Sequence, residues 1–169
     1  EVLSDPELAK VVDILCRHYP STNSDPAADQ TGKPLWSSED YAADNTGAGG
    51  RCQGRILNQN FVNGNMTATI SWNLISSYYS WLQWSNDGLM MARTPWSGHY
   101  TVSPPIFSIA HTTQFAQPGW AILPVGQGSG TLAQGGTFVT YVDGGSSDGG
   151  SDSGPSFAAS GEFALVIEK

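Results

Sequence analysis

Residues 33–40 read KPLWSSED, and the prediction of the fold starts from this stretch. Leu35 and Trp36 are apolar, two serines follow, and the stretch ends with the adjacent carboxylates Glu39 and Asp40. A short apolar run between polar segments is typical of a buried strand. The sequence therefore predicts a strand that ends at Glu39 and presents acidic side chains at its carboxyl end.

Two further apolar runs lie on either side of this stretch. Residues 11–16 (VVDILC) lead into residues 17–20 (RHYP), and residues 68–75 (ATISWNLI) are rich in β-branched and aromatic side chains. Residues 55–62 (RILNQNFV) space their apolar pairs as on one face of a helix, and residues 4–7 (SDPE) resemble a helix start. Strand, connection, strand, helix and strand in this order predict βα units with a parallel sheet.

Functional side chains of parallel βα units gather at the carboxyl ends of the strands. Three successive strand ends here carry polar or aromatic side chains: His18 and Tyr19, Glu39 and Asp40, and Trp72 and Asn73. A carboxylate in such a position can act as a nucleophile or general base. An indole beside it offers a flat apolar wall to the C–H face of a pyranose ring. We therefore predict that these side chains converge on a carbohydrate site.

Each of these residues also has a structural explanation. His18 can cap a loop, and Trp72 alone would more often belong to a core. Glu39 and Asp40 can form an acidic pair at a helix N-terminus, where the helix dipole favours negative charge. The convergence of three strand ends is what favours the functional interpretation over these alternatives.

From about Leu89 the pattern changes to short apolar runs that Gly and Pro turns separate. The runs occupy residues 106–110, 121–123, 137–142 and 163–167. Without a helical period, they predict antiparallel β-structure arranged as a sandwich. We expect Trp96 and Trp120 to belong to its core.

The charge balance excludes some classes of partner. The 169 residues include 7 basic and 15 acidic side chains, with a formal net charge of -8, so nucleic acid is a poor candidate. No apolar run approaches the roughly 20 residues of a transmembrane helix. The abundance of Gly, Ser, Thr and Trp favours a secreted carbohydrate-active protein. A start at Glu1 rather than Met suggests a processed or excised piece, although an arbitrary boundary would look the same.

Residues 65–67 (NMT) fit the N-glycosylation sequon, which makes Asn65 a candidate glycan site in an exposed turn. A chance match in a Thr-rich chain is an equally good explanation. Of the two cysteines, Cys16 lies in an apolar run and is expected to be a buried free thiol. Cys52 lies in a Gly-rich segment that we expect to be a loop, where a disulfide to a partner outside this chain is plausible.

Residues 143–155 (DGGSSDGGSDSGP) have the composition of a flexible linker. Asp143, Asp148 and Asp152 offer the hard oxygen ligands that calcium prefers, but they lack the spacing of an EF-hand. The linker is the favoured interpretation, and no metal or cofactor is expected.

Three long strings carry a resemblance to a known family. They are LWSSED (35–40), GRILNQNFVNGNMTATISWNLISSYY (54–79) and GLMMARTPWSGHYTVSPPIFSIAHTTQFAQPGW (88–120). From about Val11 to Gly136 the chain resembles glycoside hydrolase family 59. The resemblance implies a (β/α)8 TIM barrel followed by a β-sandwich, a fold of the α/β plus all-β class. Residues 1–84 would supply the sixth to eighth barrel strands, and residues 85–169 would supply part of the sandwich.

The resemblance also implies a function and roles for individual residues. It implies a retaining β-galactosidase that acts on galactosylceramide-like glycolipids, is secreted or lysosomal, and is helped by a saposin-like lipid carrier. Glu39 of the WSSE motif would be the nucleophile, and Trp72 of the ISW motif would line the galactose pocket. His18 and Tyr19 would flank that pocket and help to bind the substrate.

The chain also departs from the pattern of this family. Retaining hydrolysis needs a second carboxylic acid about 5–5.5 Å from the nucleophile, and the family supplies it from a fourth strand that this chain does not contain. We therefore expect a fragment that holds the nucleophile and is itself inactive. The alternative is a non-catalytic β-rich module, derived from the family, that binds carbohydrate or serves a structural role. Ala42 stands where the animal enzymes have Ser, and Cys52 matches a cysteine whose family partner lies further downstream.

Overall fold

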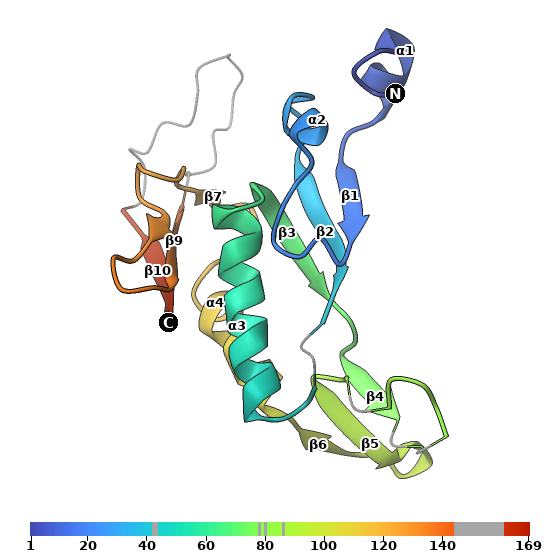
Figure 1. Ribbon diagram of the computed structural model, residues 1–169. Coiled ribbons are helices and arrows are strands. Elements are labelled where there is room, and N and C mark those ends of the chain that lie inside the picture. Colours follow the sequence, from blue (N-terminus) through green and yellow to red (C-terminus); the bar gives the residue numbers. More distant parts are fainter. Residues whose placement is uncertain (42–43, 78, 80, 86, 144–160) are drawn as a thin grey trace.

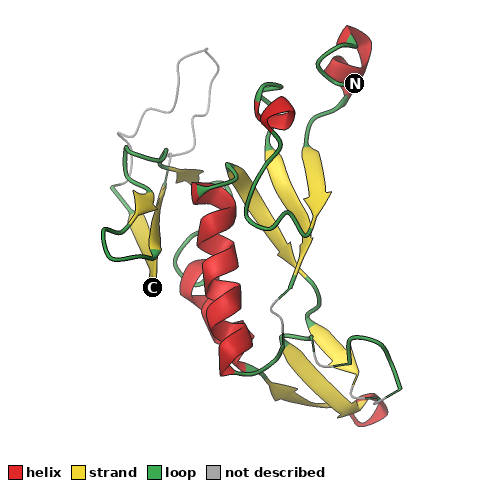
Figure 2. Cartoon of the chain, viewed as in Figure 1, coloured by secondary structure: helices red, strands yellow, loops and turns green. Residues whose placement is uncertain are grey.

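The computed structural model describes residues 1–41, 44–77, 79, 81–85, 87–143 and 161–169. Three small sheets and two long helices form the described part of the chain (Figures 1 and 2). The strands up to Ser71 form a parallel sheet, and the described strands from Ile75 onward form two further sheets with one helix between them in sequence.

The parallel sheet has the order β1-β2-β3, with β1 at Leu15–His18, β2 at Leu35–Asp40 and β3 at Met66–Ser71. Both strand pairs are parallel, so the prediction of a parallel sheet is confirmed, and the KPLWSSED strand lies at its centre. The short helix α2 (Pro26–Asp29) connects β1 to β2, and the long helix α3 (Gly47–Val62) connects β2 to β3.

The chain starts with the predicted short helix. This helix, α1 (Pro6–Val11), has Asp5 as its N-cap, and the Asp5 side chain accepts hydrogen bonds from the amides of Glu7 and Leu8. The first strand therefore begins at Leu15, four residues after the start of the predicted run, because Val11 still belongs to α1.

Helix α3 begins eight residues before the helix predicted at residues 55–62, because the glycine-rich segment from Gly47 forms its first turns. Thr46 is the N-cap, and its Oγ1 accepts a hydrogen bond from the amide of Ala48. Asp44 Oδ1 accepts a further hydrogen bond from the amide of Gly49. A Cβ at Gly49 would lie 1.6 Å from the carbonyl oxygen of Asp44, so this close approach requires glycine. The prediction that Cys52 lies in a loop is wrong, since it lies on this helix.

Figure 1 shows α3 between the parallel sheet and a second sheet that contains β9 (Thr137–Val142) and β10 (Phe163–Glu168). Helix α3 carries three fully buried amide side chains: Gln53, Asn58 and Asn60. Asn58 donates from Nδ2 to the carbonyl oxygens of Thr137 (3.3 Å) and Val166 (3.1 Å). The two carbonyls belong to β9 and β10 of the second sheet, so hydrogen bonds as well as packing join α3 to that sheet.

The described strands after β3 form two sheets. One comprises β4 (Ile75–Ser77), β5 (Met90–Thr94) and β6 (His99–Val102), with a 3-10 turn, η1 (Pro95–Ser97), between β5 and β6. The other comprises β7 (Ala121–Ile122), β8 (Gly130–Thr131), β9 (Thr137–Val142) and β10 (Phe163–Glu168). The predicted strands at 121–123, 137–142 and 163–167 are confirmed, whereas the sandwich and the domain boundary at residue 84 stay predictions.

One predicted strand of the second half is wrong. Residues 106–110 lie in helix α4 (Pro104–Thr113), which follows Ser103 with two prolines in its first turn. Tertiary packing explains the helix, since α4 lies along α3 and the hydroxyl of Ser108 donates to the carbonyl of Gly50 at 2.6 Å. Pairing is also not purely antiparallel, because β5 runs parallel to β4 and antiparallel to β6.

Three side chains are less buried than predicted. Trp96 is 76% exposed on η1 instead of lying in a core, and Trp120 is only partly buried. Cys16 is exposed rather than buried, because β1 is an edge strand of the described sheet and its neighbours cover little of it.

Among the residues that the structure describes, none of the helices has the length and apolar character needed to cross a membrane. The same residues contain no group of three or more His, Cys, Asp or Glu side chains that could hold a metal ion. Asp148 and Asp152, which the calcium alternative requires, lie outside the described residues.

Asn58→Ala should lower the free energy of unfolding by about 2 kcal/mol, because it removes two hydrogen bonds from a buried donor between α3 and the second sheet. Urea unfolding of the 169-residue chain measures this change. Arg55→Ala is the matched control on the same helix; its side chain is exposed, and the substitution should change stability by less than about 0.5 kcal/mol. Equal effects of the two substitutions would contradict the role assigned to Asn58.

Candidate active site

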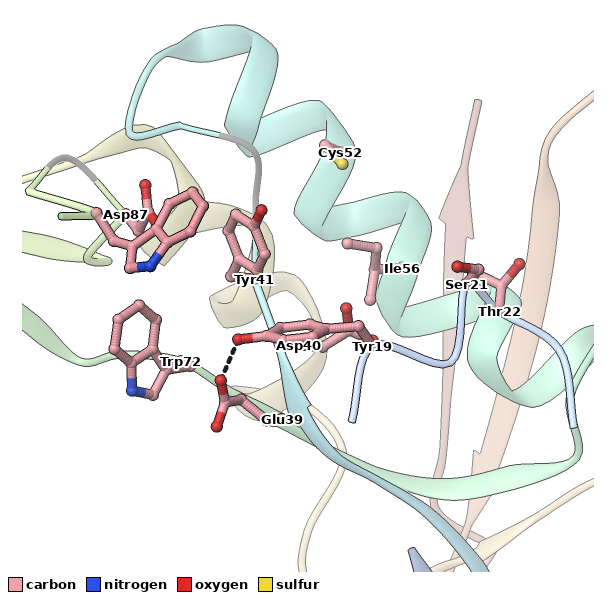
Figure 3. Close-up of a pocket in the computed structure, with 11 residues that line it drawn as sticks. Tyr19, Ser21, Thr22, Glu39, Asp40, Tyr41, Cys52, Ile56, Trp72 and Asp87 are labelled. Atoms are coloured by element: carbon pink, nitrogen blue, oxygen red, sulfur yellow. Dashed lines mark hydrogen bonds between the residues drawn. The ribbon is translucent and has the colours of Figure 1, made fainter. Parts of the chain in front are cut away.

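A cavity of about 690 Å³ opens at the carboxyl end of the parallel sheet (Figure 3). Residues from the strand ends, from α3 and from the connection between β4 and β5 line it: Tyr19, Ser21, Thr22, Glu39, Asp40, Tyr41, Cys52, Ile56, Trp72, Trp84 and Asp87. Glu39, Tyr19 and Trp72, which the sequence placed on three neighbouring strand ends, therefore meet at one cavity.

The end of β2 is irregular, and the irregularity separates the two carboxylates. Ser37 pairs with Thr69 of β3, but the next pair is Asp40 with Ser71, so β2 carries one extra residue there. The pairing with β1 shifts at the same place. An extra residue of this kind is a β-bulge, which bends the strand and redirects its side chains. Ser37 and Asp40, three residues apart, are consequently both buried, while Glu39 between them is more exposed; both carboxylates line the cavity.

Glu39 is held by both neighbouring strand ends. Its carbonyl oxygen accepts a hydrogen bond from the amide of Tyr19 at 2.9 Å, and the carbonyl of Asp40 accepts one from the amide of Trp72 at 2.6 Å. The Tyr19 hydroxyl donates to Glu39 Oε1, as Figure 3 shows, and His18 Nδ1 lies 3.7 Å from Glu39 Oε2. His18 thus reaches the carboxylate from outside the residues that line the cavity.

Tyr19 is constrained on several sides. Its φ of 45° lies in the left-handed region, which is unfavourable for a bulky residue and is often found at functional sites. The Tyr41 ring packs edge-on against it, with 5.3 Å between ring centroids. The hydrogen bond to Glu39, supported by partial burial and the negative charge of Glu39, raises the pKa of Tyr19 to about 12. Tyr19 therefore stays a neutral donor at any physiological pH.

The wall opposite the strand ends was not found from the sequence. Trp84 and Asp87 come from the β4–β5 connection, and burial, reinforced by the negative charge of Asp44, raises the pKa of Asp87. The stretch WLQWSND (81–87), rich in tryptophan and low in charge, is the signal that could have indicated these residues. Cys52 is a free thiol at the cavity, and the disulfide implied for it by the family stays a prediction.

Comparison with known sequences agrees with this geometry. Residues 1–114 match the family described as Glycosyl hydrolase family 59. The chain is 53% identical over 143 residues to galactocerebrosidase from Homo sapiens, and 55% identical over 139 residues to that from Salmo salar. These matches cover 85% and 82% of the chain. A putative galactocerebrosidase from Caenorhabditis elegans is 37% identical over 142 residues. The chain spans about a fifth of the length of these relatives.

Comparison with solved structures shows the fold. The catalytic domain of family 30 xylanase C from Talaromyces cellulolyticus superposes with a TM-score of 0.53 at 17% identity, over 84% of this chain and 35% of that one. The family 30 xylanase Xyn30A from Clostridium acetobutylicum gives a TM-score of 0.57 at 16% identity, over 98% and 48%. The chain therefore has the mixed α/β fold of part of a glycoside hydrolase catalytic domain.

We predict that Tyr19 titrates near 12 in the folded chain and that Glu39→Gln shifts its pKa toward the ordinary 10.0. The carboxylate favours the protonated phenol, and a neutral amide removes most of that preference. Phenolate absorbance during an alkaline titration, compared with Tyr19→Phe to identify the signal, measures the shift. An unchanged titration in Glu39→Gln would contradict the contact between the two side chains.

Proposed function

Because the chain belongs to glycosyl hydrolase family 59, we propose that it contributes the nucleophile side of a retaining glycosidase active site. Glu39 is the proposed nucleophile. The observation that carries this assignment is the position of its carboxylate: on the cavity, at the carboxyl end of the central strand, with Oε1 bound by the Tyr19 hydroxyl. The Tyr19 hydroxyl orients one oxygen of this carboxylate, and the other oxygen, Oε2, lies 3.7 Å from His18 Nδ1.

In the proposed reaction, Oε2 of Glu39 attacks the anomeric carbon while the bond to the leaving oxygen breaks. The product is a glycosyl ester on Glu39. A second carboxylic acid gives its proton to the leaving oxygen and, as a carboxylate, then takes a proton from the water that hydrolyses the ester. Tyr19 keeps its own proton throughout and orients Glu39.

The second carboxylic acid is proposed to come from outside these 169 residues. Besides Glu39, the described lining of the cavity contains two carboxyl groups, on Asp40 and Asp87. Oδ2 of Asp40 is already bound by Ser37 and Asn60. Asp87 is the remaining candidate within the chain. Since the chain spans about a fifth of the length of its relatives, an acid from another part of a longer protein fits better.

The proposed substrate is a β-galactoside, and a galactolipid in particular, because the relatives named above are galactocerebrosidases. Trp72 is proposed as the apolar wall for the sugar, and His18 and Tyr19 as residues that flank it. A saposin-like lipid carrier, a secreted or lysosomal location, and the assignment of β1–β3 as the sixth to eighth strands of a (β/α)8 barrel belong to the same proposal. Aromatic Trp84 widens the apolar wall on the opposite side of the cavity.

The 169-residue chain should form a covalent adduct at Glu39 with a galactosyl fluoride that is itself fluorinated next to the anomeric carbon. Fluoride leaves without a general acid, so this reagent needs only the nucleophile. The same chain should not turn over a nitrophenyl β-galactoside, since a missing acid/base costs about 10²–10⁴ in rate and the base is also needed to release the sugar. Intact mass and peptide mapping locate the adduct.

Glu39→Gln should abolish the adduct, and Asp87→Asn should leave it unchanged. No adduct at Glu39 would contradict its role as nucleophile and favour the alternative of a non-catalytic carbohydrate-binding module. Turnover of the nitrophenyl galactoside that both substitutions abolish would instead identify Asp87 as the acid.

Asn65 should carry a glycan in protein from a eukaryotic secretory source. It is exposed, has a φ of 52°, and lies in the turn immediately before β3. Peptide mass mapping with and without glycosidase treatment measures occupancy, and Thr67→Ala is the control that removes the sequon without changing Asn65. Unmodified Asn65 in secreted material would show that the sequon is a chance match.

A further inference from the structure

A buried polar cluster lies directly behind the proposed nucleophile. Oδ2 of Asp40 accepts hydrogen bonds from Ser37 Oγ at 2.9 Å and from Asn60 Nδ2 at 3.0 Å. Asn60 Nδ2 also donates to Thr69 Oγ1 at 2.9 Å. Ser37 and Asn60 are fully buried and Asp40 is 7% exposed, so these bonds are formed out of contact with water.

The cluster spans the bulge in β2. In a regular strand, side chains alternate between faces, so residues three apart lie on opposite faces. Ser37 and Asp40 are three apart and nevertheless joined by a hydrogen bond, because the extra residue brings both to the same face. The Ser37–Asp40 bond therefore exists only while the bulge exists.

Helix α3 fixes the bulge from outside the strand. Asn60 bonds Asp40 on the far side of the irregularity and Thr69 on the neighbouring strand β3. The side-chain amide of Asn60 thus joins α3 both to the end of β2 and to β3. A buried hydrogen bond of this type is costly to leave unmade, so the alternative regular pairing is disfavoured.

From these contacts we infer that Asp40 and Asn60 are positioning residues that hold the β2 bulge and thereby direct the Glu39 carboxylate into the cavity toward Tyr19. The inference rests on the proposed function for its catalytic meaning, because Glu39 is there the nucleophile. Its geometric content does not depend on that assignment. Neither residue needs to contact a substrate, since each acts through the backbone on either side of Glu39.

Asn60→Ala removes the helix contact, and Asn58→Ala is its matched control. Both asparagines are fully buried amides of α3, but Asn58 bonds the second sheet and not β2. Both substitutions should destabilise the chain. Only Asn60→Ala should move the Tyr19 titration from about 12 toward 10.0, followed by NMR of the labelled tyrosine ring carbons with Tyr19→Phe for assignment. Adduct formation at Glu39 with the galactosyl fluoride should slow roughly tenfold or more in Asn60→Ala alone.

Ser37→Ala provides a second test if Asn60→Ala does not fold, because it removes one hydroxyl and leaves the helix contact intact. It should shift the Tyr19 titration in the same direction. Wild-type titration in the folded Ser37→Ala and Asn60→Ala chains would overturn the inference, and so would an equal shift in Asn58→Ala. A titration that shifts as expected in a chain without an adduct at Glu39 would support the positioning role and refute the proposed nucleophile.

Discussion

Two buried asparagines on opposite sides of one helix hold the described structure together. Asn58 and Asn60 are two residues apart, which is about 200° around an α-helix, so their side chains leave α3 in nearly opposite directions. One bonds carbonyls of β9 and β10, and the other bonds β2 and β3. The helix consequently lies between two sheets and presents a buried amide side chain to each of them. An amphipathic surface helix would instead bury a single apolar face. Hydrogen bonds of fixed length and direction define the spacing of these layers.

This arrangement explains why the site could be foreseen only in part. The strand at 35–40 and the parallel order were predictable because local apolar runs and their spacing encode them. Strand order predicted that Glu39 and Trp72 lie on neighbouring strand ends, whereas the face that Glu39 occupies depends on the bulge. The bulge was not predictable, since no residue in WSSED marks an extra position, and it depends on Asn60 from a helix twenty residues later.

Elsewhere, tertiary contacts override the local pattern. Residues 106–110 look like a strand in isolation, and they form a helix because α3 offers a surface on which α4 packs. Cys16 and Trp96 are apolar residues that the described neighbours leave uncovered. Trp84 and Asp87 reach the cavity through a connection whose course no periodicity specifies. Sequence patterns identified the strands of the parallel sheet, whereas partners distant in the sequence determined the fold of residues 106–110, burial and the outer wall of the site.

The bulge in β2 determines which face of the strand each residue from Ser37 to Asp40 occupies. With two residues between them, Ser37 and Asp40 share the buried face and Glu39 has the open one. Regular pairing of the same residues, without the bulge, would exchange the two acids, placing Glu39 on the buried face beside Ser37 and Asp40 on the open face. Every residue type at the site would still be present in such a chain. The strand register across this four-residue stretch therefore matters as much as the identity of its residues.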